Sequence, residues 1–163
     1  MLKVTLPTKV REEGQKWIDA DPERENLLGK AHLTVIFIGR DLDERTHEHI
    51  INGGKWLAGK AQVPRQLLSK GFFSMFGGKK TLAAPIMDDE RLANARNILE
   101  RGLVHHGIQV KRDYAFNPHV SLGKSPKVAQ EPNVRIHGGV FDVVSVEVKL
   151  GSEMLTLPMA WSK

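Results

Sequence analysis

Two short segments of the sequence each place a histidine and a hydroxyl side chain two positions apart. One segment carries His32 and Thr34, the other carries His119 and Ser121, and each pair is separated by one apolar residue. Side chains alternate between the two faces of a β-strand, so each histidine would share a face with its hydroxyl. Histidine titrates near neutral pH and can act as base or acid, and hydroxyls can donate to phosphate oxygens. The pattern predicts a site that cleaves a phosphodiester and requires no metal ion.

Both motifs are expected on strands. Pro118 precedes His119, and the first position of a strand tolerates the missing N–H of proline. The apolar run within 31–39 predicts a central strand that is covered on both faces for part of its length. If the two strands face each other across one cleft, the two motifs together supply a base, an acid and two phosphate donors.

The remaining elements indicate an α+β domain rather than a repeat of βαβ units. Thr8 is expected to cap the first helix, and Gly77-Gly78 is expected to turn a hairpin. No linker divides the chain, so residues 1–163 are interpreted as a single domain with two lobes. The other expected helices and strands are helices 10–20, 44–58 and 88–106 and strands 3–6, 71–76, 81–87, 140–150 and 154–157.

Composition narrows the class of protein. The 163 residues include no cysteine, which excludes disulfides, thiolate metal ligands and a thiol nucleophile. The net charge of +5 and pI near 9.6 favour polyanionic partners, although on charge alone a merely cationic surface is equally good. No apolar window has the length of a membrane span, and the first residues lack the apolar core of a signal peptide. We therefore expect a cytoplasmic protein with no membrane partner.

With both motifs in view, the sequence resembles the 2H phosphoesterase superfamily, whose members carry two His-x-Thr/Ser-x signatures. The two histidines lie 87 positions apart, which suits one motif per lobe, and Gly39 and Gly123 close the two motif strands. A helix is expected before Phe116-Asn117-Pro118-His119, as in that superfamily. The resemblance extends from the first strand to about Leu150. The superfamily includes bacterial RNA 2′,3′-cyclic phosphodiesterases and phage enzymes that destroy nucleotide signals in antiviral defence.

This resemblance implies a bilobal fold in which two pseudo-symmetric antiparallel-sheet lobes, with outer helices, enclose a central groove. It implies hydrolysis without a metal or cofactor, with His32 and His119 as acid and base and with Thr34 and Ser121 holding the phosphate. The expected substrate is one of three kinds: a 2′,3′-cyclic phosphate on a nucleotide or an RNA end, a 2′-5′-linked oligonucleotide, or a cyclic oligonucleotide. Which histidine is the base stays open, as do base specificity and oligomeric state.

Other side chains are weaker candidates. Lys124, Arg112 and Tyr114 flank the second motif and could contact a substrate phosphate or base, and Lys30 has the equivalent position before the first motif. Glu147 could orient a histidine. Four aromatic residues could stack on a base but are more typical of core or plain surface, namely Phe37, Phe73, Phe76 and Trp161.

Two alternatives from other classes stay open. A nucleotide- or RNA-binding module could retain the groove and hydrolyse nothing, and a structural domain would use the two histidines for stability alone. No obligatory protein partner is expected. Hydrolysis assays of variants at the two histidines discriminate between these readings.

Overall fold

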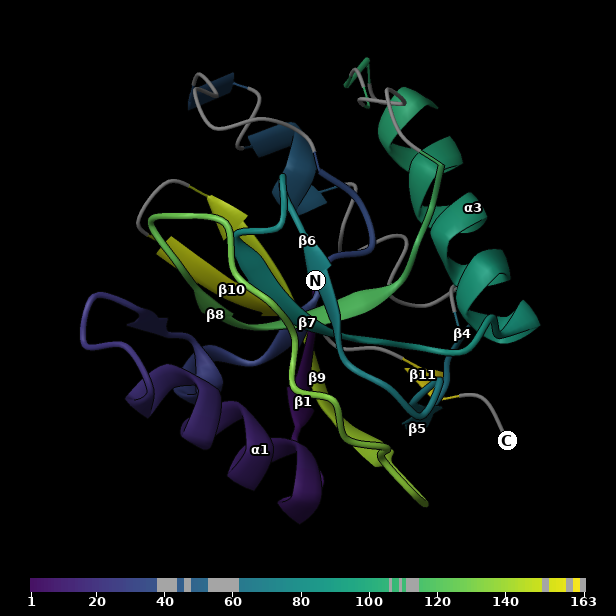
Figure 1. Ribbon diagram of the computed structural model, residues 1–163. Helices are drawn as coiled ribbons and strands as arrows, with labels where there is room; N and C mark the ends of the chain where they lie inside the picture. The colour runs from purple at the N-terminus through teal and green to yellow at the C-terminus, as the bar shows by residue number, and fades with distance from the viewer. Residues whose placement is uncertain are drawn as a thin grey trace.

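The computed structural model describes residues 1–37, 44–45, 48–52, 62–105, 107–108, 110, 115–150, 153–157 and 160–161. Figure 1 shows a central sheet with the helices on its outside. The helical elements include α1 (Thr8–Asp19), a 3-10 turn (Leu28–Lys30) and α3 (Glu90–His105), and residues 44–45 and 48–52 are also helical. The strands are β1 (Leu2–Thr5), β2 (Glu25–Asn26), β3 (His32–Leu33), β4 (Gln62–Val63), β5 (Gln66–Leu68), β6 (Ser74–Phe76), β7 (Thr81–Pro85), β8 (His119–Lys124), β9 (Val140–Leu150), β10 (Glu153–Leu157) and β11 (Ala160–Trp161).

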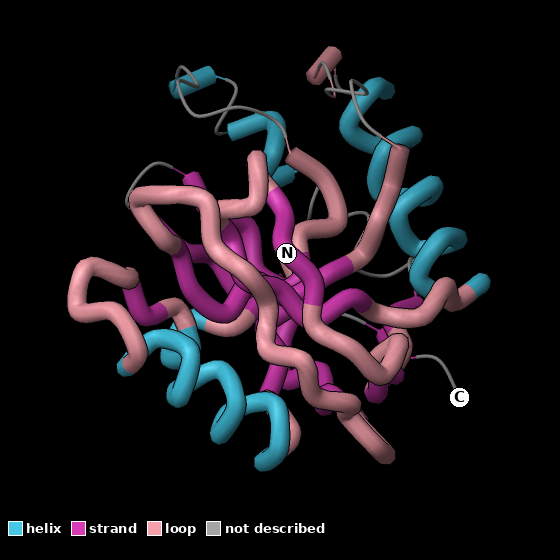
Figure 2. Tube along the Cα trace, viewed as in Figure 1, coloured by secondary structure: helices cyan, strands magenta, loops and turns pink. Residues whose placement is uncertain are grey.

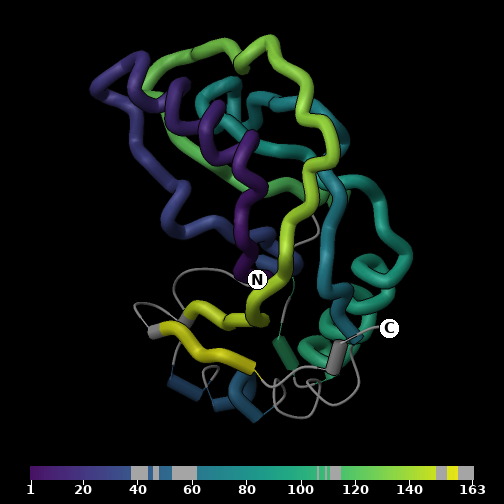
Figure 3. The backbone as a smooth tube through the Cα atoms, turned by 90° about the horizontal axis from the view of Figure 1, so that it is seen from below, coloured from purple at the N-terminus to yellow at the C-terminus, as the bar shows by residue number. Residues whose placement is uncertain are grey.

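The sheet is antiparallel and curled, with the strand order β10-β9-β1-β3-β8-β7-β6. The strands β3 and β8 pair with each other at its centre, and each has its own outer partner, β1 for β3 and β7 for β8. Figure 2 shows the strands gathered at the centre, with α1 along one side and α3 along the other. Figure 3 shows the long strand β9 linking the region of β1 to that of β10. The expected α+β fold with antiparallel sheets and outer helices is confirmed, and its two halves meet at the β3–β8 pair.

The core lies behind the central strands and is closed by α1. The apolar side chains of this helix, including Val10, Trp17 and Ile18, are buried in the same cluster as the apolar residues of β3 and β8. The expected inner position of Trp17 and Ile18 is therefore confirmed. The expected cap at Thr8 is wrong, because Thr8 is already helical and Pro7 occupies the capping position without a side-chain hydrogen bond. Proline has no polar side-chain atom with which to cap.

The strand expected over 31–39 is much shorter than its apolar run indicated. Within the described residues 31–37, the paired positions are His32 and Leu33, with two partners on β1 and one on β8. Val35 is nonetheless 6% exposed and lies in the core, so the apolar run reflects burial rather than pairing. Gly39, expected to close the strand, lies outside the described residues.

The later elements agree in type with expectation, although β6 covers only Ser74–Phe76 of the strand expected over 71–76. The hairpin of β6 and β7 turns at residues 77–80, where Gly77, Gly78 and Lys79 have φ of 58°, 68° and 62°. The helix α3 ends before Gly107, as expected. Of the helix expected over 44–58, residues 44–45 and 48–52 are helical, and its other positions lie outside the described residues. Within the described part of the chain, no helix is both long and apolar enough to cross a bilayer.

Candidate active site

The two motifs lie on neighbouring strands, with Leu33 of β3 as the antiparallel partner of Val120 of β8. Both of these side chains are 0% exposed and belong to the core cluster. Because side chains alternate along each strand, the residues flanking Leu33 and Val120 project from the opposite face of the sheet. The structure therefore places both histidine motifs on one accessible face, over a fully buried apolar backing.

Continuing this register by one residue in each direction pairs the motifs crosswise. His32 falls opposite Ser121, and Thr34, which follows β3 directly, falls opposite His119. Residues directly opposite on antiparallel strands have Cβ atoms about 4.5–5.5 Å apart. The two histidines and Ser121 are half-buried, and Thr34 is exposed. Each histidine thus has the hydroxyl of the other motif as its cross-strand neighbour.

The imidazole rings are held by the same backbone contact in both motifs. Nδ1 of His32 lies 2.8 Å from the carbonyl oxygen of Lys30, and Nδ1 of His119 lies 2.8 Å from that of Asn117. A carbonyl oxygen can only accept a hydrogen bond, so Nδ1 must donate and carry the proton. In the neutral form this leaves the lone pair on Nε2 of each ring. Both rings therefore offer the same atom for proton transfer.

The ring of His119 also contacts an aromatic side chain, and this contact was not predicted from the sequence. The ring stacks on Phe76 of β6, with ring centroids 4.2 Å apart and an interplanar angle of 9°. Such aromatic pairs contribute about 0.5–1.5 kcal/mol beyond their buried area. Phe76 was expected to be core or plain surface, with base stacking as the alternative, and its contact with His119 instead restricts the rotation of that ring.

A β-bulge brings Lys124 to the same face as the motif. The register of β7 with β8 shifts between Leu82, opposite Gly123, and Ala83, opposite Ser121, so that Leu122 is the extra residue. Simple alternation from Ser121 would turn Lys124 toward the core. With the extra residue, Lys124 pairs with Thr81 on the face that carries Ser121. The exposed Lys124 is thus placed where an anionic substrate at the motifs could attract it.

Lys3 is a site candidate that the sequence reading missed. It is exposed on β1 and is the direct antiparallel partner of His32. Lys3 therefore shares a face with His32 and adds a second positive charge to that face. Its strand, β1, borders β3 on the edge opposite to β8, which carries Lys124. The alternation of residues 2–5 indicated a strand, but only the register shows which residue of that strand faces His32.

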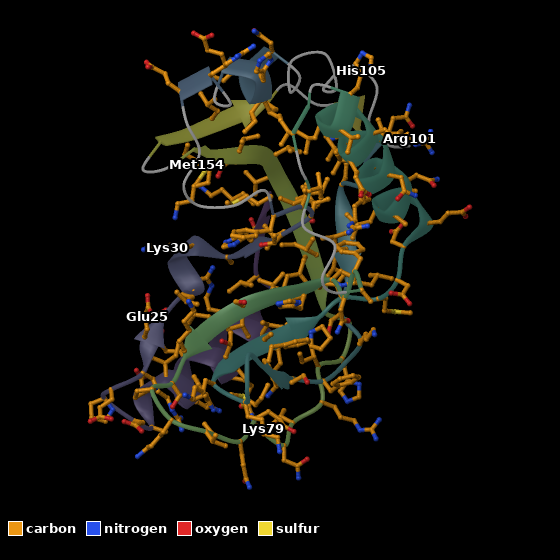
Figure 4. The ribbon with its side chains drawn as sticks, turned by 90° about the horizontal axis from the view of Figure 1, so that it is seen from above. Glu25, Lys30, Lys79, Arg101, His105 and Met154 are labelled. Carbon is orange, nitrogen blue, oxygen red and sulfur yellow. The ribbon has the colours of Figure 1, made fainter. Side chains whose placement is uncertain are left out.

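The other candidates have different outcomes. Arg112 and Tyr114 lie outside the described residues, and they stay predictions. Lys30 takes part through its backbone carbonyl, and Figure 4 shows it next to the central strands. Glu147 accepts a hydrogen bond from Ser145 at 3.2 Å. Of the other aromatic candidates, Phe73 is buried in the core and Phe37 is exposed, while the side chain of Trp161 lies outside the description. Among the described residues, no three histidine or acidic side chains cluster as metal ligands would.

Comparison of the sequence with models of known families and with curated proteins finds no match. Solved structures match nearly the whole chain. LigT of E. coli, complexed with 3′-AMP, shares 17% identity at a TM-score of 0.61, covering 96% of this chain and 95% of its own. TT0787 of Thermus thermophilus shares 21% identity at a TM-score of 0.62, covering 96% of both chains. The PDE domain of MHV ns2 shares 7% identity at a TM-score of 0.60, covering 96% of this chain and 99% of its own.

At such low identities the agreement concerns architecture, and it extends over nearly the whole chain. The expectation drawn from two four-residue motifs is therefore confirmed at the level of the backbone. This chain has the fold of the 2H phosphoesterases.

Proposed function

We propose that this protein is a phosphodiesterase that hydrolyses RNA-type or cyclic nucleotide phosphodiesters, with His32 and His119 as general acid and base. The observation that supports this most strongly is the pair of matching Nδ1 contacts, at 2.8 Å in each motif, on adjacent strands. They leave Nε2 of both rings available on one face of the sheet. The fold shared with LigT complexed with 3′-AMP and with a PDE domain supports the same class of reaction.

The proposed chemistry is an acid–base displacement at phosphorus. The neutral histidine accepts a proton at Nε2 from the attacking water, and a new P–O bond forms. The protonated histidine delivers its Nε2 proton to the leaving oxygen as the old P–O bond breaks. Each such proton transfer contributes about 10²–10⁴-fold to a rate. Water supplies the hydroxyl group that phosphorus gains and, through the two histidines, the proton that the leaving oxygen gains, so the scheme is balanced without a cofactor.

The hydroxyls and the lysines serve the phosphate itself. Thr34 and Ser121 donate hydrogen bonds to the non-bridging oxygens, which gain charge as the reaction proceeds. Lys3 and Lys124, on the same face as the histidines, attract the anionic substrate to this face. The crosswise pairing places a hydroxyl beside each histidine, so one phosphate can contact all four motif side chains.

Three phosphodiesters fit this apparatus: a 2′,3′-cyclic phosphate on an RNA end or mononucleotide, a 2′-5′ linkage, and a cyclic oligonucleotide. On a mononucleotide the first leaves a nucleoside monophosphate at the site, and a similar structure was solved with 3′-AMP. We therefore place the 2′,3′-cyclic phosphate first among them. The other two would make the protein an enzyme that removes nucleotide signals.

Hydrolysis of a nucleotide panel in the presence of EDTA tests this function. The panel contains 2′,3′-cyclic nucleoside monophosphates, 2′-5′ oligoadenylate and 3′-5′ cyclic di- and trinucleotides. Wild type is compared with His32→Ala, His119→Ala and, as a matched control, His105→Ala at the exposed end of α3. Circular dichroism and urea unfolding confirm that each variant is folded.

We expect turnover in EDTA that each of the two motif variants lowers by orders of magnitude and that the control retains. Turnover that disappears with EDTA would contradict the metal-free scheme. Turnover that survives both motif substitutions would show that the histidines are not the catalysts. If no substrate is hydrolysed but nucleotides bind through the motif face, the protein is a binding module instead.

A further inference from the structure

A large hollow lies along the outer edge of β6 and shares no residue with the site described above. Its volume is about 1020 Å³, and its two walls are residues 70–75 with Lys79 and residues 129–137. Figure 1 shows β6 and the yellow-green segment after β8 running side by side at the front of the molecule. The hollow therefore lies between the edge strand of the sheet and a long connecting segment.

Backbone hydrogen bonds hold the two walls together at their ends only. At one end the N–H of Ala129 donates to the carbonyl of Lys79 at 3.0 Å, and at the other the N–H of Ile136 donates to the carbonyl of Gly71 at 2.8 Å. Within this fully described part of the chain, no backbone hydrogen bond joins residues 130–134 to β6. The free edge of β6 thus lines an open channel that is fixed at both ends.

The channel is basic. Lys70, Lys79 and Arg135 line it and are exposed, as is His137, and the one acidic residue among its lining is Glu131. No acidic side chain of the described residues forms an ion pair with any of the three cations. Figure 4 shows Lys79 at the outer rim of the molecule. Unpaired cations gathered along a groove attract a polyanion and release its counterions on binding.

An aromatic side chain projects into the same channel. Phe72 lines it and is 49% exposed. A backbone bridge to Arg135 fixes its position in the wall. Exposed aromatic rings between cations are the feature on which nucleic-acid bases stack, at about 1–3 kcal/mol per base. Protein partners of a sheet edge do not require this combination of a ring and cations.

The channel leads toward the histidines through β6. Ser74, in the channel wall, pairs with Ala83, which pairs with Ser121, so Ser74 lies two strand spacings from the motif. Two spacings correspond to about 10 Å. At the end of the same strand Phe76 stacks on His119. A strand bound in the channel could therefore reach the motif face with its terminal phosphate.

We propose that this channel binds single-stranded RNA, so that the enzyme acts on the end of an RNA chain in preference to a free mononucleotide. The inference rests on the proposed function and names its substrate class. The cations contact the phosphates upstream of the reacting end, and Phe72 stacks on an upstream base. An acidic peptide that extends the β6 sheet is the competing occupant.

Two measurements test the channel, one with catalysis and one without it. The first compares kcat/KM for a hexaribonucleotide ending in a 2′,3′-cyclic phosphate with that for the corresponding nucleoside 2′,3′-cyclic monophosphate. The second follows binding of a fluorescent hexaribonucleotide with a 3′-phosphate by anisotropy, as a function of salt. The test variants are Lys79→Gln/Arg135→Gln and Phe72→Leu. Arg11→Gln/Arg101→Gln removes the same charge from the exposed faces of α1 and α3 and is the control.

We expect the channel variants to lose about tenfold or more in kcat/KM for the hexamer, with mononucleotide hydrolysis within twofold of wild type. Removal of two phosphate contacts should reduce the slope of log affinity against log salt by about 1.4, and the control should leave it unchanged. Equal effects of test and control variants on the hexamer would overturn the channel. Binding of an acidic peptide, but not of RNA, that depends on the channel would overturn it as well. Hexamer binding that depends on the channel without any hydrolysis would retain the channel and reject the proposed function.

Discussion

The two histidine motifs carry the same kinds of side chain but differ in how many paired strand residues hold them. The first motif lies on β3, which has two residues, whereas the second begins β8, which has six and pairs with β2, β3 and β7. Yet each histidine makes the same 2.8 Å contact with the carbonyl two residues before it. The geometry of the ring thus depends on a local backbone contact and on one shared register, and it does not require a long strand.

The difference appears in what surrounds each ring. His119 is stacked on Phe76, and its strand packs so closely on α1 and β2 that a Cβ atom at Gly123 would lie only 3.1–3.2 Å from their nearest atoms. His32 instead lies beside the exposed Lys3 on β1. The second motif is therefore the rigid half of the site, and the first is the half with the charged neighbour.

The largest expected effect tests whether the two halves act as one unit. His32→Ala and His119→Ala should each lower kcat by about 10³-fold, because each removes one proton transfer. If the histidines act in the same step, the double variant should be less than tenfold worse than either single variant. Single-turnover rates on a 2′,3′-cyclic nucleotide measure this. Losses that multiply in the double variant would show that the two histidines contribute independently. That result would contradict the view that the two halves of the site act as one unit.

The next largest decrease in kcat is expected on removal of either hydroxyl, Thr34 or Ser121, and the two decreases should be nearly equal. Thr34→Val and Ser121→Ala each remove one donor to the phosphate, and removal of a comparable donor elsewhere costs about 10²-fold in kcat. Thr5→Val, at an exposed position of β1, is the matched control. A much smaller loss for Thr34 than for Ser121 in steady-state kinetics would indicate that the shorter strand holds its hydroxyl poorly.

The packing difference is tested by adding one methyl group. In Gly123→Ala the new Cβ would lie 3.1 Å from the carbonyl oxygen of Glu25 and from Cγ1 of Ile18, and 3.2 Å from Cζ3 of Trp17. Such overpacking destabilises a core by about 1–3 kcal/mol. Gly29→Ala, where the added Cβ meets no atom within 4 Å, is the control. Urea unfolding should separate the two, and equal stabilities would mean that α1 adjusts freely.

The smallest effect concerns the stacked ring. Phe76→Leu removes an interaction of about 0.5–1.5 kcal/mol, so kcat should fall by about two- to tenfold. Because Phe76 acts by positioning His119, KM should stay within twofold of wild type. Met87→Leu, at an exposed position after β7 and outside both the motifs and the channel, should change neither parameter. A rise in KM with an unchanged kcat would indicate that Phe76 contacts the substrate rather than the histidine.

Much of the arrangement was accessible from the sequence, because alternation along a strand is a local property. It predicted that each histidine shares a face with the hydroxyl of its own motif. It could not predict the bulge at Leu122, which turns Lys124 toward the motif face, since a bulge depends on pairing between β7 and β8. The neighbours Lys3 and Phe76 likewise depend on register between distant segments. The length of β3 was overestimated because apolar residues such as Val35 serve the core without being paired.

The crosswise register of the two motifs also means that neither half of the chain contains a complete site. The cross-strand neighbour of each histidine belongs to the other motif, so a fragment that contains one motif alone lacks both partner contacts. Two separately produced halves, divided in the turn at 77–80, would each be inert on any substrate. Because the halves would also pair through β1 with β9, β5 with β9 and β6 with β7, turnover regained on mixing would report assembly of the whole sheet around the β3–β8 pair.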